Sequence, residues 1–200
     1  MKTAAIVLAA GKSERMGKNK LLLKLDGTTL INSILDALEA SGIGEIIVVL
    51  GHEPQEIMNE IKHKLNSVRV AINERYEEGM TSSFKIGLKQ IQGADAAFLV
   101  LGDEPILNHR FLRVMIERME KAGGNVLIIS PIHKGKKGHP LLFSEQLFDE
   151  ILNLKEREVI RDVVHRHTDK LVTVDAPVWT ILDIDTPEDF EKIQNLLANQ

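Results

Sequence analysis

Short apolar runs alternate with amphipathic segments along most of the chain. Continuous hydrophobic runs without polar alternation predict strands that are buried on both faces of a sheet. We expect such strands at 3–9, 46–50, 68–72, 96–101 and 126–129. Between them, apolar residues recur at helical spacing, which predicts helices that cover the sheet. We expect these helices at 29–41, 54–65, 80–91 and 111–119.

The pattern is less regular in the C-terminal third. It predicts short helices at 144–152 and 159–165, strands at 171–174 and 180–183, and a last helix at 187–197. Thr186 is expected to cap that helix, with Asp189 in its first turn. A brief extended piece is expected at 21–23. Segment 134–143 contains two glycines and three lysines, and it is expected to be a mobile basic loop followed by a short apolar piece.

The alternation of strands and helices predicts an α/β fold with a mostly parallel twisted sheet and helices on both faces. Neither a linker nor an internal repeat divides the chain, so we expect one domain over residues 1–200. In such sheets, ligands bind beyond the carboxyl ends of the strands. The residues that directly follow each strand are therefore the candidate functional residues.

Composition narrows the function classes. The chain has 200 residues, of which 44% are hydrophobic, enough for a sizeable core. A net charge of -4 argues against a nucleic-acid-binding protein. The absence of Cys excludes thiolate chemistry and Cys-ligated metals. No apolar run approaches the roughly 20 residues of a membrane span, so we expect a cytoplasmic protein with no membrane partner.

The loop after the first strand carries small residues and cations. Leu8, Ala9, Ala10 and Gly11 end the strand and begin the loop. Ala9, Ala10 and Gly11 have little or no side chain, so their backbone N–H groups can approach a phosphate. Arg15 and Lys20 follow, and together they can hold a triphosphate and stabilise charge on its leaving group. The loop matches neither G-x-x-x-x-G-K-[ST] nor G-x-G-x-x-G.

A second polar stretch follows the strand at 68–72. It contains Asn73 and then Gly79, Met80, Ser82 and Ser83. Gly79 can turn the chain, and the residues after it would form a first helical turn with free N–H groups and hydroxyls. This stretch is a candidate niche for a base, ribose or phosphate, or else an ordinary helix cap.

Acidic residues stand at two further places. Asp103 follows the strand at 96–101, where a rigidly held carboxylate is well placed to bind Mg²⁺ together with substrate phosphates. Asp183 and Asp185 lie on the same side of an extended segment near the C-terminus. Such a pair either shares a cation or stays solvated.

Five stretches resemble one known family. They read L-A-A-G-x-S-x-R-M-G-x-x-K at 8–20, G-M-x-S-S-x-x-x-G at 79–87, G-D-x-P at 102–105, G-H-P at 138–140 and D-x-D-T-P-x-D at 183–189. Together they resemble the nucleotidyltransferases with a sugar-nucleotide-transferase-like fold. The branch that they resemble contains the molybdenum-cofactor cytidylyltransferases and their guanylyltransferase relatives.

The resemblance implies roles for these residues. Arg15, Lys20 and Asp103 would be catalytic, and the first loop and the stretch around Gly79 would bind the nucleotide. Asp103 would bind Mg²⁺ with Asp185 as the second ligand, or with Asp183 in its place. His139 would contact the acceptor or its phosphate; otherwise it is a turn residue beside a proline.

The resemblance also implies substrates and partners. L-A-A-G favours CTP, because the guanylyl branch usually has L-A-G-G. The acceptor would be molybdopterin or a similar phosphorylated small molecule, and a molybdoenzyme or its chaperone would be a downstream partner. Two departures concern the acceptor and metal sites. The usual G-D-x-G-A-R segment is missing, which leaves Arg157 or Arg161 for its basic role, and Glu104 replaces Gln or Met, adding to the metal site or facing water.

Other interpretations remain open from the sequence. A guanylyltransferase or a nucleotidyltransferase acting on a sugar or alcohol phosphate would show similar motifs. A non-catalytic nucleotide-binding protein for cofactor insertion could keep the same fold, but it has less need of paired acids with Lys20. A nicotinamide oxidoreductase should show G-x-G-x-x-G and an acidic residue after the second strand, where only Glu53 is available.

Overall fold

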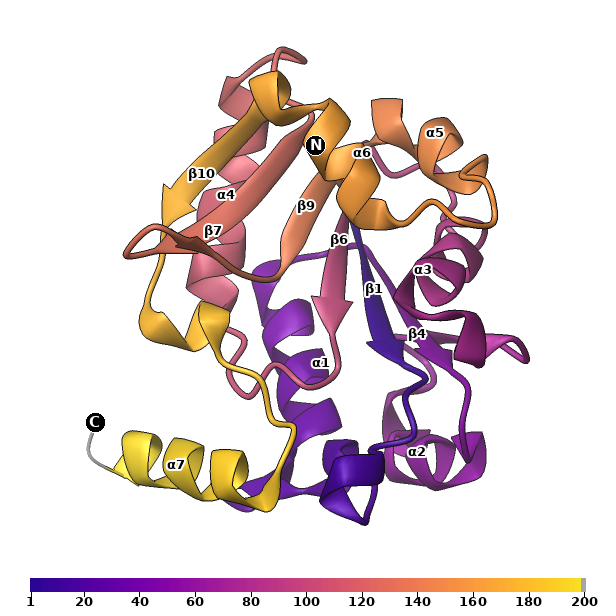
Figure 1. The fold of residues 1–200 in the computed structure, drawn as a ribbon, viewed down its shortest axis with the longest axis vertical. Helices are drawn as coiled ribbons and strands as arrows, with labels where there is room; N and C mark the ends of the chain where they lie inside the picture. Colours follow the sequence, from indigo (N-terminus) through magenta and orange to yellow (C-terminus); the bar gives the residue numbers. More distant parts are fainter. Residues whose placement is uncertain (199–200) are drawn as a thin grey trace.

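A mixed sheet forms the centre of the protein (Figure 1). The structure is a computed structural model that describes residues 1–198. Within these residues the sheet has eight strands in the order β10-β7-β9-β6-β1-β4-β5, with β8 paired to β7. The strands are β1 (Thr3–Ala9), β4 (Glu45–Leu50), β5 (Arg69–Ile72), β6 (Ala96–Leu101), β7 (Ile128–His133), β8 (Lys136–Lys137), β9 (Leu141–Ser144) and β10 (Leu171–Asp175). A separate hairpin joins β2 (Lys24–Leu25) to β3 (Thr28–Thr29).

The sheet is parallel except at β9 and β8. Strand β1 pairs in parallel with both β4 and β6, whereas β9 is antiparallel to both of its neighbours, β6 and β7. The predicted α/β fold with a mostly parallel sheet is confirmed. Because β1, β4, β5 and β6 run in one direction, their carboxyl ends meet at one edge.

Helices cover both faces of the sheet (Figure 1). One face packs against α1 (Leu30–Ser41), α2 (Pro54–Glu60) and α4 (His109–Lys121). The other packs against α3 (Met80–Leu88), α5 (Phe148–Leu152) and α6 (Ile160–Arg166). Helix α3 packs closely against β1 at Gly87, where an added Cβ would lie only 2.3 Å from Cγ2 of Ile6. The edge where the carboxyl ends of these parallel strands meet thus lies between two layers of helices.

The C-terminal segment returns to the loop that follows β1. Figure 1 shows helix α7 (Pro187–Ala198), in yellow, beside the indigo N-terminal loop. A small apolar core joins the two regions, made by Met16, Leu23, Leu25, Leu30, Ile184 and Ile193. The predicted cap of this helix is confirmed, since Thr186 Oγ1 accepts a hydrogen bond of 3.2 Å from Asp189 N.

Three expectations of secondary structure were wrong. Residues 21–23 are not extended, because Asn19 Oδ1 accepts from Leu21 N and folds the chain into a 3-10 helix at Lys20–Leu22. The strand expected at 180–183 is replaced by a 3-10 helix at Val178–Ile181, where Thr180 bonds back to Pro177 O. Segment 134–143 contains β8 and most of β9, since Phe143 pairs between Ala97 and Ile128.

In the part of the chain that the structure describes, five further 3-10 helices lie between these elements. The remaining short helices are Glu14–Met16, Lys62–Lys64, Tyr76–Glu78, Glu145–Leu147 and Thr168–Lys170. No helix among residues 1–198 is both long enough and apolar enough to cross a membrane.

Candidate active site

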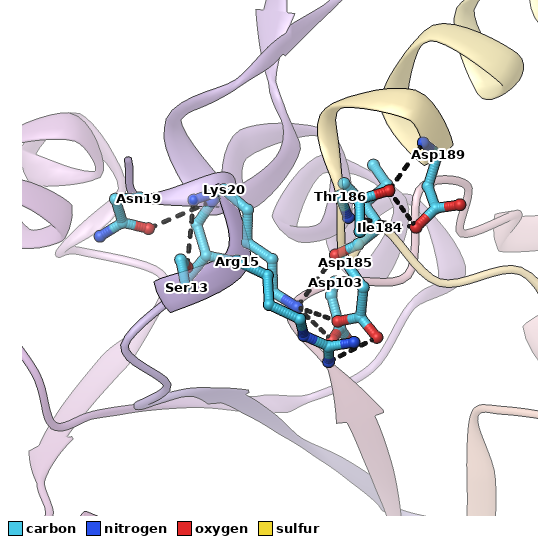
Figure 2. A network of polar contacts seen from close by, with 10 residues as sticks. Ser13, Arg15, Asn19, Lys20, Asp103, Ile184, Asp185, Thr186 and Asp189 are labelled. Atoms are coloured by element: carbon cyan, nitrogen blue, oxygen red, sulfur yellow. Dashed lines mark hydrogen bonds and ion pairs between the residues drawn. The ribbon is translucent and has the colours of Figure 1, made fainter. Parts of the chain in front are cut away.

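Lys20 connects three distant segments of the chain at the carboxyl edge of the parallel strands (Figure 2). Its Nζ donates to Asp103 Oδ2 at 2.6 Å, to Ile184 O at 3.0 Å and to Asp185 Oδ1 at 3.3 Å. Asp103 follows β6, and Asp185 precedes α7. The lysine side chain is only 14% exposed, and the carboxylates of Asp103 and Asp185 neutralise its charge. The structure thus brings together three of the residues predicted from separate motifs.

Arg15 approaches the same carboxylate from the solvent side. Its Nη2 lies 2.8 Å from Asp185 Oδ2, and its side chain is 69% exposed (Figure 2). The loop that carries both cations is shaped by Ser13, which has left-handed backbone with φ of 54° and accepts from Lys20 N at 3.2 Å. The exposed arginine remains accessible to an anionic ligand.

A cavity of about 330 Å³ opens beside this network. Most of the predicted nucleotide-binding residues line it, namely Leu8, Ala9, Ala10, Gly11, Lys20, Gly79, Met80, Ser83 and Asp103. Arg15 and Asp185 line an adjoining depression, which shares Ser13 and Lys20 with the first cavity. Small residues together with Lys20 in the cavity and Arg15 in the adjoining depression are typical of a site for a phosphorylated ligand.

Tyr76 lines the same cavity, and the sequence analysis missed it. In the sheet, β1 lies between β6 on one side and β4 and β5 on the other. Because Tyr76 follows β5 and Asp103 follows β6, these two residues lie on opposite sides of the loop that follows β1. Gly51 allows the tyrosine to lie close, because a Cβ there would be 2.6 Å from Tyr76 Cβ and 2.9 Å from Ala10 Cβ. An aromatic residue in the polar segment after β5 was the available signal.

Asn73 and Ser82 are turned toward the protein itself. Asn73 is 1% exposed, and its amide donates to Ser82 Oγ at 2.8 Å and to Ser83 Oγ at 2.9 Å. Its Oδ1 accepts from Arg75 N at 3.0 Å. Among the described residues around the 330 Å³ cavity, Asn73 and Ser82 are not wall residues. Asn73 therefore holds the start of α3 in place behind Ser83.

Two more carboxyl groups lie near Asp103. Partial burial, together with the charges of Asp103 and Asp185, raises the pKa of Asp183. Glu104 is 2% exposed and accepts from Leu101 N at 3.1 Å, and burial raises its pKa well above the ordinary value. Of the two alternatives for Glu104, exposure to water was wrong, because its carboxyl group is buried and closes the turn at the end of β6.

The donor set suits a cation that is shared with a substrate. No group of three or more His, Asp or Glu side chains arranged for a metal occurs in the described part of the chain. Asp103 and Asp185 instead offer two carboxylates that converge on one ammonium group. Mg²⁺ is commonly held by one or two carboxylates plus substrate phosphates, so this pair fits that ion.

A second cavity of about 580 Å³ continues from the first on the β6, β9 and β7 side. Gly79 and Met80 line both cavities. His139 lines the second cavity, and its backbone N–H donates to Thr180 O at 2.9 Å. Burial lowers the pKa of this imidazole, against an opposing effect of Asp103. Its Nδ1 atom is buried and has no hydrogen-bond partner among residues 1–198.

The sequence is similar to proteins of known type over most of its length. The family model described as MobA-like NTP transferase domain matches residues 5–171. The chain is 31% identical to the Molybdenum cofactor cytidylyltransferase of Escherichia coli (strain K12), over 92% of each chain. It is 26% identical to the Probable molybdenum cofactor guanylyltransferase of Natranaerobius thermophilus, over 98% of this chain and 96% of the relative.

A solved structure with bound manganese is also similar to this chain. The complex of Rv0371C with manganese from Mycobacterium tuberculosis H37Rv superposes with a TM-score of 0.77 and 27% identity, covering 98% of this chain and 99% of that one. The loop after β1, the end of β6 and both cavities fall within the range that the family model matches.

Proposed function

This chain belongs to the MobA-like NTP transferase family and is a nucleotidyltransferase, and from that premise we propose its substrates. We propose that it transfers the cytidylyl group of CTP to molybdopterin and releases pyrophosphate, with Mg²⁺ as its metal. The observation that carries the proposal is the contact of Lys20 with both Asp103 and Asp185 beside the small-residue loop.

The reaction needs charge neutralisation more than proton transfer. A phosphate oxygen of the acceptor attacks the α-phosphorus, the bond to the bridging oxygen of the β-phosphate breaks, and pyrophosphate leaves. Because the acceptor oxygen is already anionic, no general base is required. Lys20 and Arg15 would neutralise the growing charge on the leaving pyrophosphate. Backbone N–H groups of Ala10 and Gly11 would hold the phosphates in line.

Lys20 must exchange one contact when the triphosphate binds. An ammonium group has three donors, and in this structure all three are used. The contact with Asp185 is the longest, at 3.3 Å, so it is the first that a phosphate oxygen would replace. Asp103 and Asp185 would hold Mg²⁺, which polarises phosphoryl oxygens when bound.

The arrangement of the cavities supports transfer between two ligands. Tyr76 and Ala10 border the β4 side, Lys20 and Asp103 lie near β1 and β6, and the second cavity lies toward β9 and β7. We propose that base, phosphates and acceptor occupy these positions in this order. The α-phosphate would then lie where the two cavities meet.

The choice of CTP is supported by Ala10, which gives the loop its L-A-A-G form, and by the 31% identity to a cytidylyltransferase. The second candidate is GTP, favoured by the guanylyltransferase relative that aligns over 98% of the chain. Molybdopterin, the organic part of the molybdenum cofactor, is chosen as acceptor because the names of both relatives contain the molybdenum cofactor.

The experiment that tests the function is pyrophosphate release with Mg²⁺, molybdopterin and each of the four NTPs in turn. Release with CTP alone is the expected result. Release with GTP alone would replace the nucleotide in the proposal. Nucleotide binding without release would overturn molybdopterin as the acceptor, and a screen of sugar and alcohol phosphates would follow.

A further inference from the structure

The second cavity has a basic rim whose charges are not neutralised by the protein. Lys137, Arg161 and His165 line it, and Glu78 is its single acidic residue in the described chain. Glu78 already forms an ion pair with Arg75. The rim therefore presents net positive charge to a ligand, which favours an anionic group such as a phosphate.

Arg161 stands out among the arginines of this region. Within residues 1–198 it forms neither an ion pair nor a side-chain hydrogen bond, although its neighbour Arg166 bonds to both Glu150 and Glu158. Arg157 is also exposed, but it lies outside the cavity wall. Of the two arginines that the sequence left open for the basic role, the geometry therefore selects Arg161.

The mouth of this cavity is apolar. Met80 and Val159 both line it, and each is 47% exposed, although large apolar side chains are usually buried. Further inside, Leu99, Leu141 and Ile160 continue the apolar wall. Such a surface gains free energy when a ligand with apolar or aromatic area covers it.

Each of the two hydroxyl groups in the wall already makes one hydrogen bond within the protein. Ser130 Oγ donates to Pro131 O at 3.1 Å, and Thr81 Oγ1 accepts from Ile160 N at 3.2 Å. His139 is the remaining polar side chain deep in the cavity, and its lowered pKa leaves it uncharged at neutral pH. The positive charge that an acceptor phosphate needs must therefore come from the rim.

We propose that Arg161 is the acceptor-binding residue, which holds the phosphate of the acceptor while Met80 and Val159 pack on an uncharged ring attached to that phosphate. This inference rests on the proposed function in one respect, that the second cavity receives the acceptor. It adds the residue that determines acceptor binding, and it disfavours simple sugar phosphates because they have no apolar ring to cover Met80 and Val159.

The first test is steady-state kinetics with CTP saturating and molybdopterin varied. We expect Arg161→Ala to raise the KM for molybdopterin by roughly tenfold to a hundredfold, as for a lost hydrogen bond to a charged group. The KM for CTP should stay within about twofold, which shows that the nucleotide loop is intact. Arg157→Ala is the matched control, and equal effects of the two variants on the acceptor KM would overturn the inference.

A second test does not depend on turnover. The wild-type protein should bind phenyl phosphate more tightly than glucose 1-phosphate in a calorimetric titration, because only the former carries an apolar ring. Arg161→Ala should weaken phenyl phosphate binding by roughly tenfold, while Arg157→Ala should not. Equal binding of the two probes, or binding that survives in Arg161→Ala, would overturn the inference.

The two assays separate the inference from the proposed function. If the wild-type protein fails to use molybdopterin but binds phenyl phosphate through Arg161, the proposed acceptor is wrong and the binding role of Arg161 stands. If molybdopterin is used with an unchanged KM in Arg161→Ala, the proposed function stands and the role of Arg161 falls.

Discussion

The two cavities along one edge of the sheet differ in whether the protein itself neutralises their cationic side chains. In the first, Lys20 is 14% exposed and is neutralised by Asp103 and Asp185 before any ligand arrives. In the second, Arg161 has no partner among the described residues, and Met80 and Val159 expose apolar surface. The first cavity is thus a preorganised network, whereas the second is an open surface whose charges are satisfied by a ligand.

The difference separates chemistry from recognition. Groups that stabilise transition-state charge must be fixed in place, because any reorganisation adds to the barrier. Groups that recognise an acceptor bind its ground state and its transition state about equally, and they can remain exposed until the acceptor arrives. We therefore expect substitutions in the first cavity to act on kcat, and substitutions in the second to act on the acceptor KM.

The largest effect is expected from Lys20→Ala or Asp103→Ala. Either change removes one side of the 2.6 Å ion pair and should lower kcat by roughly 1,000-fold. Both side chains are partly exposed, so the fold should survive, as circular dichroism and thermal unfolding can verify. Lys18→Ala, at an exposed lysine of the same loop, is the control. Near-normal turnover in either purified variant would remove the network from the mechanism.

A pair of glycines tests the backbone beneath each cavity. A Cβ on Gly138 would lie 2.0 Å from the carbonyl oxygen of Thr180, whereas one on Gly51 would meet the side chain of Tyr76 at 2.6 Å. The 2.0 Å clash is the closer of the two, and the Cβ atoms that Gly51→Ala meets are also fixed to the backbone. Gly138→Ala should therefore cost about 3 kcal/mol of unfolding free energy and Gly51→Ala about 2 kcal/mol. Urea titration measures both values.

Gly44→Ala provides the matched control for these glycines. Its added Cβ would lie 3.9 Å from Thr3 O, an ordinary contact, so its unfolding free energy should change little. Gly51→Ala should also raise the KM for the nucleotide, because Ala10 lies 2.9 Å from the added atom. A larger loss of stability in Gly51→Ala than in Gly138→Ala would contradict the packing described for both cavities.

The sequence predicted the first cavity far better than the second. Loop residues 8–20 form one continuous stretch after a strongly apolar strand, and Asp103 follows another such strand. A local pattern is enough to place both at the carboxyl edge of a parallel sheet. Their contact with Asp185 is long-range, but the extended D-x-D pattern marked that residue as well.

The second cavity depends on pairings that no local pattern reveals. Strand β9 has only four residues, and its position is set by antiparallel pairing with β6 and β7. Arg161 and Arg157 are equivalent in the sequence, and only the folded structure, in which Ile160 N donates to Thr81 Oγ1 of α3, shows that Arg161 lines the cavity. The buried turn role of Glu104 was likewise hidden, because a carboxylate is usually solvated.

A smaller effect distinguishes the two aspartates before α7. Asp185 contacts Arg15 at 2.8 Å and Lys20 at 3.3 Å, while Asp183 forms no ion pair within the described residues. We expect Asp185→Ala to lower kcat/KM by roughly tenfold to a hundredfold and Asp183→Ala by less than about threefold. Titrating activity with Mg²⁺ checks the assignment. If Asp183→Ala shifts the Mg²⁺ requirement more than Asp185→Ala, the second metal ligand is Asp183.

The smallest effect concerns His139, a largely buried group in the wall of the second cavity. Burial lowers its pKa below the ordinary value of 6.5, so the unfolded chain takes up a proton at a higher pH than the folded chain does. Its neutral form therefore supports stability above about pH 6.5, and that support is lost as the pH falls toward the lowered pKa. The loss is at most about 1.4 kcal/mol per pH unit.

His139→Asn should remove this acid-sensitive part of the stability. We expect the unfolding free energies of wild type and variant to converge as the pH falls from 7.5 to about 5, because only the wild type loses stability through this imidazole. His165→Asn, at an exposed histidine on the rim of the same cavity, serves as the control. A constant difference between wild type and His139→Asn across that range would mean that the imidazole is protonated equally in both states. Below about pH 6.5 the second cavity would then hold a charged histidine, and the rim alone would not supply the phosphate-binding charge at that pH.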